Sequence, residues 1–134
     1  MAMNVLVCDD DVTVRLLVRR TLEEHLECQV RECGDGSEAL VALNEESFAF
    51  AILDVGMPGL GGIATLEEIR ASKQTESLPV IILTAERDED TVRALLGLGV
   101  SDYLLKPLRP TMLWAKVEAL VGKLQEQGGP VPSE

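Results

Sequence analysis

Asp9, Asp10 and Asp11 stand in a row directly after a short apolar segment, and Asp54 ends a second apolar segment. Adjacent carboxylates repel one another, and a bound cation offsets that cost. Carboxylate oxygens suit Mg²⁺, which usually keeps several waters and bridges to phosphate oxygens. Simpler roles also exist, because one aspartate of the run can cap a helix and Asp54 can belong to a turn.

Two further polar side chains occur at comparable places. Thr84 ends a third apolar segment, and Lys106 follows a fourth. A carboxylate such as that of Asp54 can attack phosphorus to give an acyl phosphate. A hydroxyl and an ammonium group can then hold the transferred phosphoryl oxygens. Together these residue types are suited to Mg²⁺-dependent phosphoryl transfer, provided that the fold brings them together.

The elements that must position these side chains alternate along the chain. Apolar runs predict strands at 4–8, 29–33, 48–54, 78–83 and 102–105. Apolar residues at helical spacing predict helices at 12–26, 38–44, around 63–69, 88–98 and 110–124. Five strands alternating with five helices over short connections predict right-handed crossovers and a parallel sheet between two helical layers, an α/β fold. Since parallel strands end at a common edge, Asp9, Asp10, Asp54, Thr84 and Lys106 are expected to converge there.

Length and composition limit what the chain can be. Its 134 residues are enough for one domain, expected over 1–124, with 125–134 as a flexible tail or the start of a linker. The net charge of −11 argues against direct nucleic-acid binding. No apolar run reaches about 18 residues and the N-terminus does not resemble a signal peptide, so we expect a cytoplasmic protein without a membrane segment. Of its three cysteines, Cys8 and Cys33 lie in apolar runs and are expected to be buried free thiols rather than zinc ligands.

Four short motifs occur in a fixed order at the predicted strand ends. They are Asp9-Asp10, the run from Asp54 to Pro58 with Gly62, Thr84-Ala85, and the run from Tyr103 to Pro107. Each motif alone is weak, but in this order the chain resembles a response-regulator receiver domain over residues 4–124. The resemblance implies a flavodoxin-like (βα)5 fold, doubly wound, with strand order 2-1-3-4-5.

The resemblance also implies roles for individual residues. Asp54 would accept a phosphoryl group from a sensor histidine kinase or a phosphotransfer protein. Asp9, Asp10, Asp54 and the backbone carbonyl of Gly56 would bind Mg²⁺, while Thr84 and Lys106 would contact the phosphoryl group.

A switch is implied as well, in which Thr84 moves toward the phosphoryl group and Tyr103 becomes buried, so that a different face meets a downstream partner. The resemblance allows a dimer that forms on phosphorylation. It also implies a cis peptide bond between Lys106 and Pro107, the only class of bond for which cis costs little.

Two other residues invite interpretation. His25, the only histidine, is interpreted as a surface residue rather than a phosphate carrier. Trp114 either completes the edge of the core or contributes to a contact face formed by the fourth helix, fifth strand and fifth helix.

Two alternative functions remain open at this stage. Residues 9–13 also resemble the first motif of haloacid-dehalogenase-type phosphatases, with Asp9 as nucleophile and Asp11 as general acid. Such enzymes need further acidic metal ligands after the lysine, where only one helix and a tail are predicted here, and Asp54 would have no role. The other alternative is a receiver-like binding module that is never phosphorylated.

Overall fold

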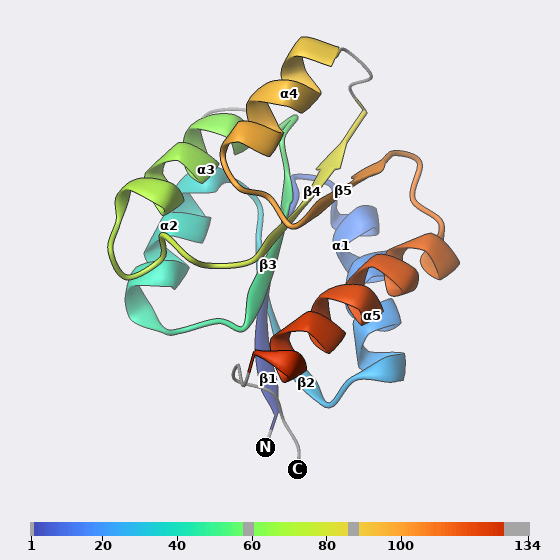
Figure 1. Cartoon of the computed structure of the whole chain (residues 1–134). Helices are drawn as coiled ribbons and strands as arrows, with labels where there is room; N and C mark the ends of the chain where they lie inside the picture. Colours follow the sequence, from blue (N-terminus) through green and yellow to red (C-terminus); the bar gives the residue numbers. More distant parts are fainter. Residues whose placement is uncertain (1, 58–60, 86–88, 128–134) are drawn as a thin grey trace.

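The computed structural model describes residues 2–57, 61–85 and 89–127, without the side chains of Glu89 and Thr91. Strands and helices alternate strictly through these ranges (Figure 1): β1 Met3–Cys8, α1 Val12–His25, β2 Cys28–Cys33, α2 Gly36–Glu45, β3 Phe50–Asp54, α3 Gly62–Ala71, β4 Val80–Thr84, α4 Glu89–Gly97, β5 Asp102–Leu105 and α5 Pro110–Glu126. This is the alternation that the apolar periodicity predicts.

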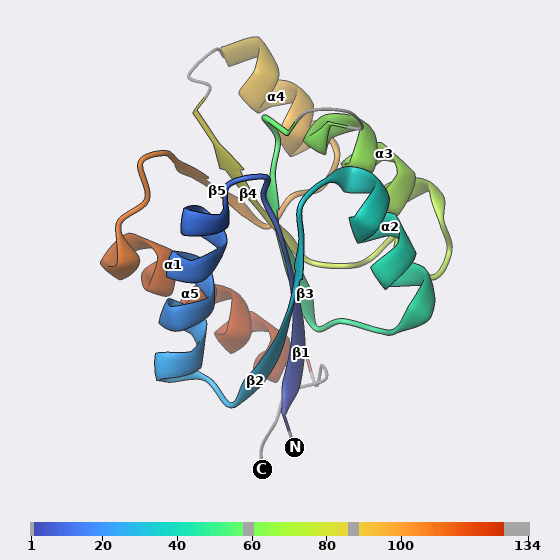
Figure 2. The same cartoon turned by 180° about the vertical axis from the view of Figure 1, so that it is seen from behind.

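The five strands form one parallel sheet in the order β2-β1-β3-β4-β5. Helices α1 and α5 lie on one side of it, and α2, α3 and α4 lie on the other, as Figures 1 and 2 show from opposite directions. The flavodoxin-like α/β architecture and the strand order are therefore confirmed.

The sheet separates two hydrophobic cores, because successive side chains of a strand point to opposite faces. Val5, Val7 and Ile52 are fully buried toward α1 and α5. Leu6 and Leu53 are buried toward α2 and α3. Burial on both faces explains why these strands are apolar without alternation.

Aspartates fix where the first two helices begin. An oxygen of Asp11 accepts a hydrogen bond from the Thr13 N–H at 2.8 Å, and an oxygen of Asp35 accepts one from the Glu38 N–H at 2.9 Å. Both are N-cap interactions that satisfy otherwise unpaired helix donors. Of the three consecutive aspartates, Asp11 therefore has a structural role, and Asp9 and Asp10 are left for other chemistry.

The element boundaries differ from the predicted ones by a few residues. β4 begins at Val80 rather than at 78, because Pro79 has no N–H to donate to a neighbouring strand. α5 continues to Glu126, two residues past the predicted end, since Gln125 and Glu126 are good helix formers with no breaker before them. The rest of the predicted tail, 128–134, lies outside the described residues.

Candidate functional site

The predicted polar residues lie at the carboxyl ends of the strands. Asp9 directly follows β1, Asp54 and Thr84 are the last residues of β3 and β4, and Lys106 follows β5. Asp9, Asp54 and Thr84 are buried, whereas Asp10 is exposed. A buried carboxylate is costly unless it is paired, so Asp9 and Asp54 need a counter-charge at this edge of the sheet.

Distances confirm that residues far apart in the sequence meet at this edge. The Lys106 ammonium nitrogen lies 2.9 Å from Asp9 Oδ2 and 3.4 Å from Asp54 Oδ2. One oxygen from each of Asp9, Asp10 and Asp54 falls within 4.8 Å of the others. Thr84 joins the group through its main chain, because its carbonyl accepts a hydrogen bond from the Lys106 N–H at 2.8 Å. The peptide bond from Lys106 to Pro107 is cis, as expected.

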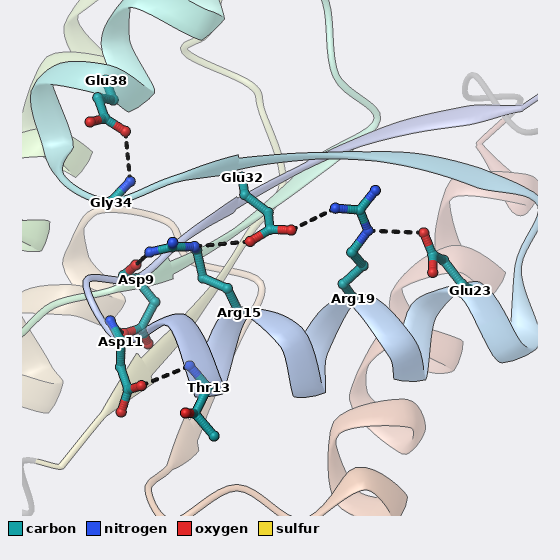
Figure 3. Close-up of polar contacts among 9 residues, drawn as sticks. All are labelled: Asp9, Asp11, Thr13, Arg15, Arg19, Glu23, Glu32, Gly34 and Glu38. Atoms are coloured by element: carbon teal, nitrogen blue, oxygen red, sulfur yellow. Dashed lines mark hydrogen bonds and ion pairs between the residues drawn. The ribbon is translucent and has the colours of Figure 1, made fainter.

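Asp9 is held at three of its four polar groups. Its N–H donates to the Cys33 carbonyl at 3.1 Å, its own carbonyl accepts from Arg15 Nη1 at 2.6 Å, and its Oδ1 accepts from the Asp11 N–H at 2.9 Å. The fourth group, Oδ2, is buried and receives no well-directed hydrogen bond, although Lys106 is close enough for an ion pair. Figure 3 shows Asp9 with its neighbours Arg15 and Asp11. A carboxylate held at three of its groups, with its remaining buried oxygen already beside one cationic group, is well suited to bind a cation.

Asp54 is positioned by the turn that follows β3. Its Oδ1 accepts a hydrogen bond from the Gly56 N–H at 3.1 Å, which leaves Oδ2 facing Lys106. The turn is compact, because a Cβ added to Gly62 would lie 2.4 Å from the Asp54 carbonyl oxygen. Glycine at the start of α3 therefore allows the helix to begin directly beside the end of β3.

Burial and charge shift the proton affinities of this group. Burial raises the pKa of the Asp9 carboxyl, and the Asp54 charge adds to the rise, while the Asp11 N–H and Lys106 oppose it. Burial alone would lower the pKa of Lys106, but attraction to Asp9 and Asp54 outweighs it and the pKa is raised. Lys106 therefore stays protonated at neutral pH and compensates part of the carboxylate charge.

The donor set fits a hard divalent cation. Three carboxylates converge on one ammonium group, which leaves negative charge for a cation to balance, and Mg²⁺ prefers oxygen ligands. The nearest thiol, Cys8, is directed elsewhere, toward the Asp35 carbonyl at 3.2 Å and the Met57 sulfur at 3.4 Å. Cys8 and Cys33 are buried free thiols, as expected, and burial raises the pKa of both, that of Cys33 to about 11.

Tyr103 lies on β5, half-buried against the α2–α3 core. A shallow hollow beside it is lined by Pro107, Met112 and Lys116, and Met112 is exposed. This placement suits a side chain with a buried and an exposed alternative, and the switch role stays a prediction.

His25 and Trp114 form a contact that sequence spacing does not reveal. Their rings stack with centroids 4.3 Å apart and planes 14° apart, joining α1 to α5. His25 is exposed, which confirms its interpretation as a surface residue. Trp114 is half-buried against the α1–α5 core, which supports the packing alternative over the contact-face alternative.

Comparison with known proteins identifies the family. Residues 5–118 match the model of the response regulator receiver domain. The chain belongs to the response regulator receiver family. It is 33% identical over 118 residues to the chemotaxis protein CheY of Pseudomonas aeruginosa, covering 88% of this chain and 95% of that protein.

Solved structures agree. The receiver superimposes on the chemotaxis response regulator CheY4 of Vibrio cholerae with a TM-score of 0.82 and 28% identity, covering 90% of this chain and 99% of CheY4. It superimposes on a response regulator from Chloroflexus aurantiacus with a TM-score of 0.83 and 30% identity, covering 91% and 99% of the two chains. Such similarity assigns the receiver to two-component signalling and leaves the phosphatase alternative without support.

Two residues that sequence reasoning missed are Arg15 and Glu32. Arg15 binds the Asp9 carbonyl from α1, and Glu32 on β2 holds Arg15 through an Nε–Oε1 contact of 3.0 Å. The sequence signal for Arg15 was its place in the first turns of the helix that follows the aspartates. Its partner Glu32 could not be found in this way, because that contact depends on how α1 packs on β2.

No helix in the described parts of the chain is both long and apolar enough to cross a bilayer.

Proposed function

We propose that this receiver accepts a phosphoryl group on Asp54 from the phosphohistidine of a sensor histidine kinase or phosphotransfer protein, in a Mg²⁺-dependent reaction. The observation that carries the proposal is the setting of Asp54. This buried carboxylate ends the central strand, has one oxygen held by a backbone N–H and the other 3.4 Å from an ammonium group, and lies among two more carboxylates. The arrangement suits a nucleophile that is held in one orientation.

Each side chain has a distinct part in the proposed transfer. An Asp54 oxygen forms the new O–P bond while the P–N bond of the donor breaks and the imidazole leaves. The Gly56 N–H holds Asp54 Oδ1, so the carboxylate does not rotate during attack. Lys106 and the Thr84 hydroxyl hold phosphoryl oxygens as the charge on them is redistributed.

The metal would be held by Asp9, Asp10, Asp54 and the Gly56 carbonyl. When bound, Mg²⁺ would neutralise the phosphoryl oxygens, which three carboxylates would otherwise repel. The convergence of three carboxylates on a single ammonium group supports this assignment.

The proposed output is a change in surface. Contact of Thr84 with the phosphoryl group would move the end of β4 and favour a buried Tyr103, which alters the hollow beside Met112. A downstream protein, or a second copy of the receiver, would bind the altered face.

Acetyl phosphate with Mg²⁺, followed by peptide mapping, tests the proposal. We expect label on Asp54 in the wild type and in Asp11→Asn, because Asp11 serves as a helix cap and asparagine caps equally well. Label should disappear in Asp54→Asn, in Asp9→Asn and without Mg²⁺. Label that persists in Asp54→Asn, or a wild type that binds Mg²⁺ and is never labelled, would contradict the proposal.

A further inference from the structure

The carbonyl that Arg15 binds belongs to the peptide unit between Asp9 and Asp10. Because a peptide unit is planar, fixing the direction of its carbonyl fixes the plane from which both residues extend. The contact from Arg15 Nη1 to the Asp9 oxygen is 2.6 Å, and it is charge-assisted. One guanidinium therefore sets the backbone orientation of two of the three clustered carboxylates.

Arg15 is itself held in place. Its Nε lies 3.0 Å from Glu32 Oε1, and the other Glu32 oxygen lies 2.6 Å from Arg19 Nη1. Arg19 also contacts Glu23 at 3.1 Å, so the chain of contacts runs along α1 (Figure 3). The Arg15 side chain is only 17% exposed, whereas that of Arg19 is 42% exposed. Glu32 thus contacts two arginines. Arg15 is half-buried and binds the Asp9 carbonyl, whereas Arg19 is more exposed and makes no contact with Asp9.

We propose that Arg15 is a positioning residue that holds the Asp9–Asp10 peptide in the orientation in which both carboxylates can bind Mg²⁺, and that Glu32 orients Arg15 for this task. The inference rests on the proposed Mg²⁺-dependent function. On this proposal Arg15 acts through the Asp9 main chain, which its guanidinium contacts, and not by binding the metal or the phosphoryl group itself. Residues that orient metal ligands in this way typically change metal affinity by 10–100-fold when they are removed.

The sign of the effect separates positioning from simple electrostatics. A guanidinium near an acidic cluster repels a dication, so a purely electrostatic role predicts tighter Mg²⁺ binding once the charge is removed. Positioning predicts the opposite, because a mobile Asp9–Asp10 peptide must be ordered when the metal binds.

The experiment measures Mg²⁺ affinity by isothermal titration calorimetry and Asp11 amide exchange by NMR without metal. The Asp11 N–H reports on the loop because it donates to Asp9 Oδ1. In Arg15→Ala we expect Mg²⁺ affinity to fall about 10-fold and the Asp11 amide to exchange faster. Arg15→Lys should lie between it and the wild type, and saturating Mg²⁺ should restore Asp54 labelling to within about 3-fold of wild type.

Arg19→Ala is the matched control. It removes an arginine from the same Glu32 carboxylate but no contact to Asp9, so both readouts should stay at wild-type values. Glu32→Gln keeps Arg15 but removes the negative charge that holds it, so it should weaken Mg²⁺ binding less than Arg15→Ala. If Arg15→Ala does not fold, the same two measurements on Arg15→Lys and Glu32→Gln test the inference.

Unchanged or tighter Mg²⁺ binding in Arg15→Ala would overturn the inference, and so would an equal loss of Mg²⁺ affinity in Arg19→Ala. In either case, labelling of Asp54 in the wild type would leave the proposed function intact. If the wild type itself bound no Mg²⁺, the proposed function would fail separately. The metal-free exchange of Asp11 would then still decide whether Arg15 orders the loop.

Discussion

At the scale of single residues, Gly62 leaves no room for a side chain. An added Cβ would lie 2.3 Å from Val55 Cα and 2.4 Å from the Asp54 carbonyl oxygen, both backbone atoms. Gly62→Ala should therefore lower the free energy of unfolding by at least about 2 kcal/mol in urea denaturation, because α3 must move away from β3.

Gly122 offers the matched control for Gly62. It lies within α5, and an added Cβ would have no atom within 4 Å. Gly122→Ala should raise the free energy of unfolding by about 0.5–1 kcal/mol, since alanine is the better helix former. Similar effects of the two substitutions would show that the approach of α3 to β3 is not tight.

Lys106 balances the buried carboxylates, and its removal should have two opposite effects. Lys106→Met should lower the free energy of unfolding of the metal-free protein by about 1–3 kcal/mol, because Asp9 and Asp54 lose their counter-charge. It should also tighten Mg²⁺ binding in a calorimetric titration, since a cation that competes for Asp9 Oδ2 is gone.

Lys116→Met serves as the control for Lys106, because it breaks a more exposed ion pair with Asp102. It should change the free energy of unfolding by less than about 1 kcal/mol and leave Mg²⁺ affinity as it is. Weaker Mg²⁺ binding in Lys106→Met would contradict the charge balance described for the site.

The three thiols should differ in reactivity. Cys28 is half-exposed and Cys8 and Cys33 are buried, while burial raises the pKa of all three thiols. Ellman's reagent at pH 8 should therefore modify one thiol per native chain readily and the other two only on unfolding. Substituting Cys28 by serine should abolish the accessible reaction, and any readily reacting thiol in that variant would contradict the burial of Cys8 and Cys33.

At the scale of elements, the features that depend on local sequence patterns, such as the buried face of a helix and the ends of the strands, were predicted from the sequence. The inward residues of α5, Leu113, Val117, Leu120 and Leu124, follow from helical spacing and are all buried. The convergence of Asp54 and Lys106 followed from one geometric fact, that parallel strands share a carboxyl edge.

Contacts between elements were not predictable in the same way. The pairs Arg15–Glu32 and His25–Trp114 each join two elements whose relative rotation no local pattern encodes. The end of α5 was missed for a different reason, because polar residues that resemble a tail are also good helix formers.

The stack between α1 and α5 gives a prediction at this scale. Trp114→Ala should lower the free energy of unfolding by about 1–3 kcal/mol, because it removes a half-buried aromatic side chain from the α1–α5 core. Light scattering should show no change in self-association. His25→Ala should cost less, since His25 is exposed, and a change of oligomeric state in Trp114→Ala would restore the contact-face alternative.

At the scale of the whole molecule, Mg²⁺ should act as a stabilising ligand. A cation that binds the folded chain raises its stability by mass action, so Mg²⁺ at about ten times its Kd should contribute about 1.4 kcal/mol. The midpoint of thermal unfolding should rise accordingly in the wild type and hardly at all in Asp9→Asn. The midpoint for Asp11→Asn should rise as much as that of the wild type. KCl of matched ionic strength should not reproduce this rise, which would separate binding at the site from screening of the net charge.

The strand order β2-β1-β3-β4-β5 also has a consequence for how the chain is made. Asp9, Asp10 and Asp54 all belong to the part that leaves the ribosome first, whereas Lys106 arrives only with the last strand. A nascent chain that has assembled β1, β2 and β3 already gathers three negative charges with no lysine to oppose them. Completion of β5 thus delivers the counter-ion together with the final edge of the sheet, and the last strand to be synthesised is the one that makes the acidic edge electrostatically tolerable.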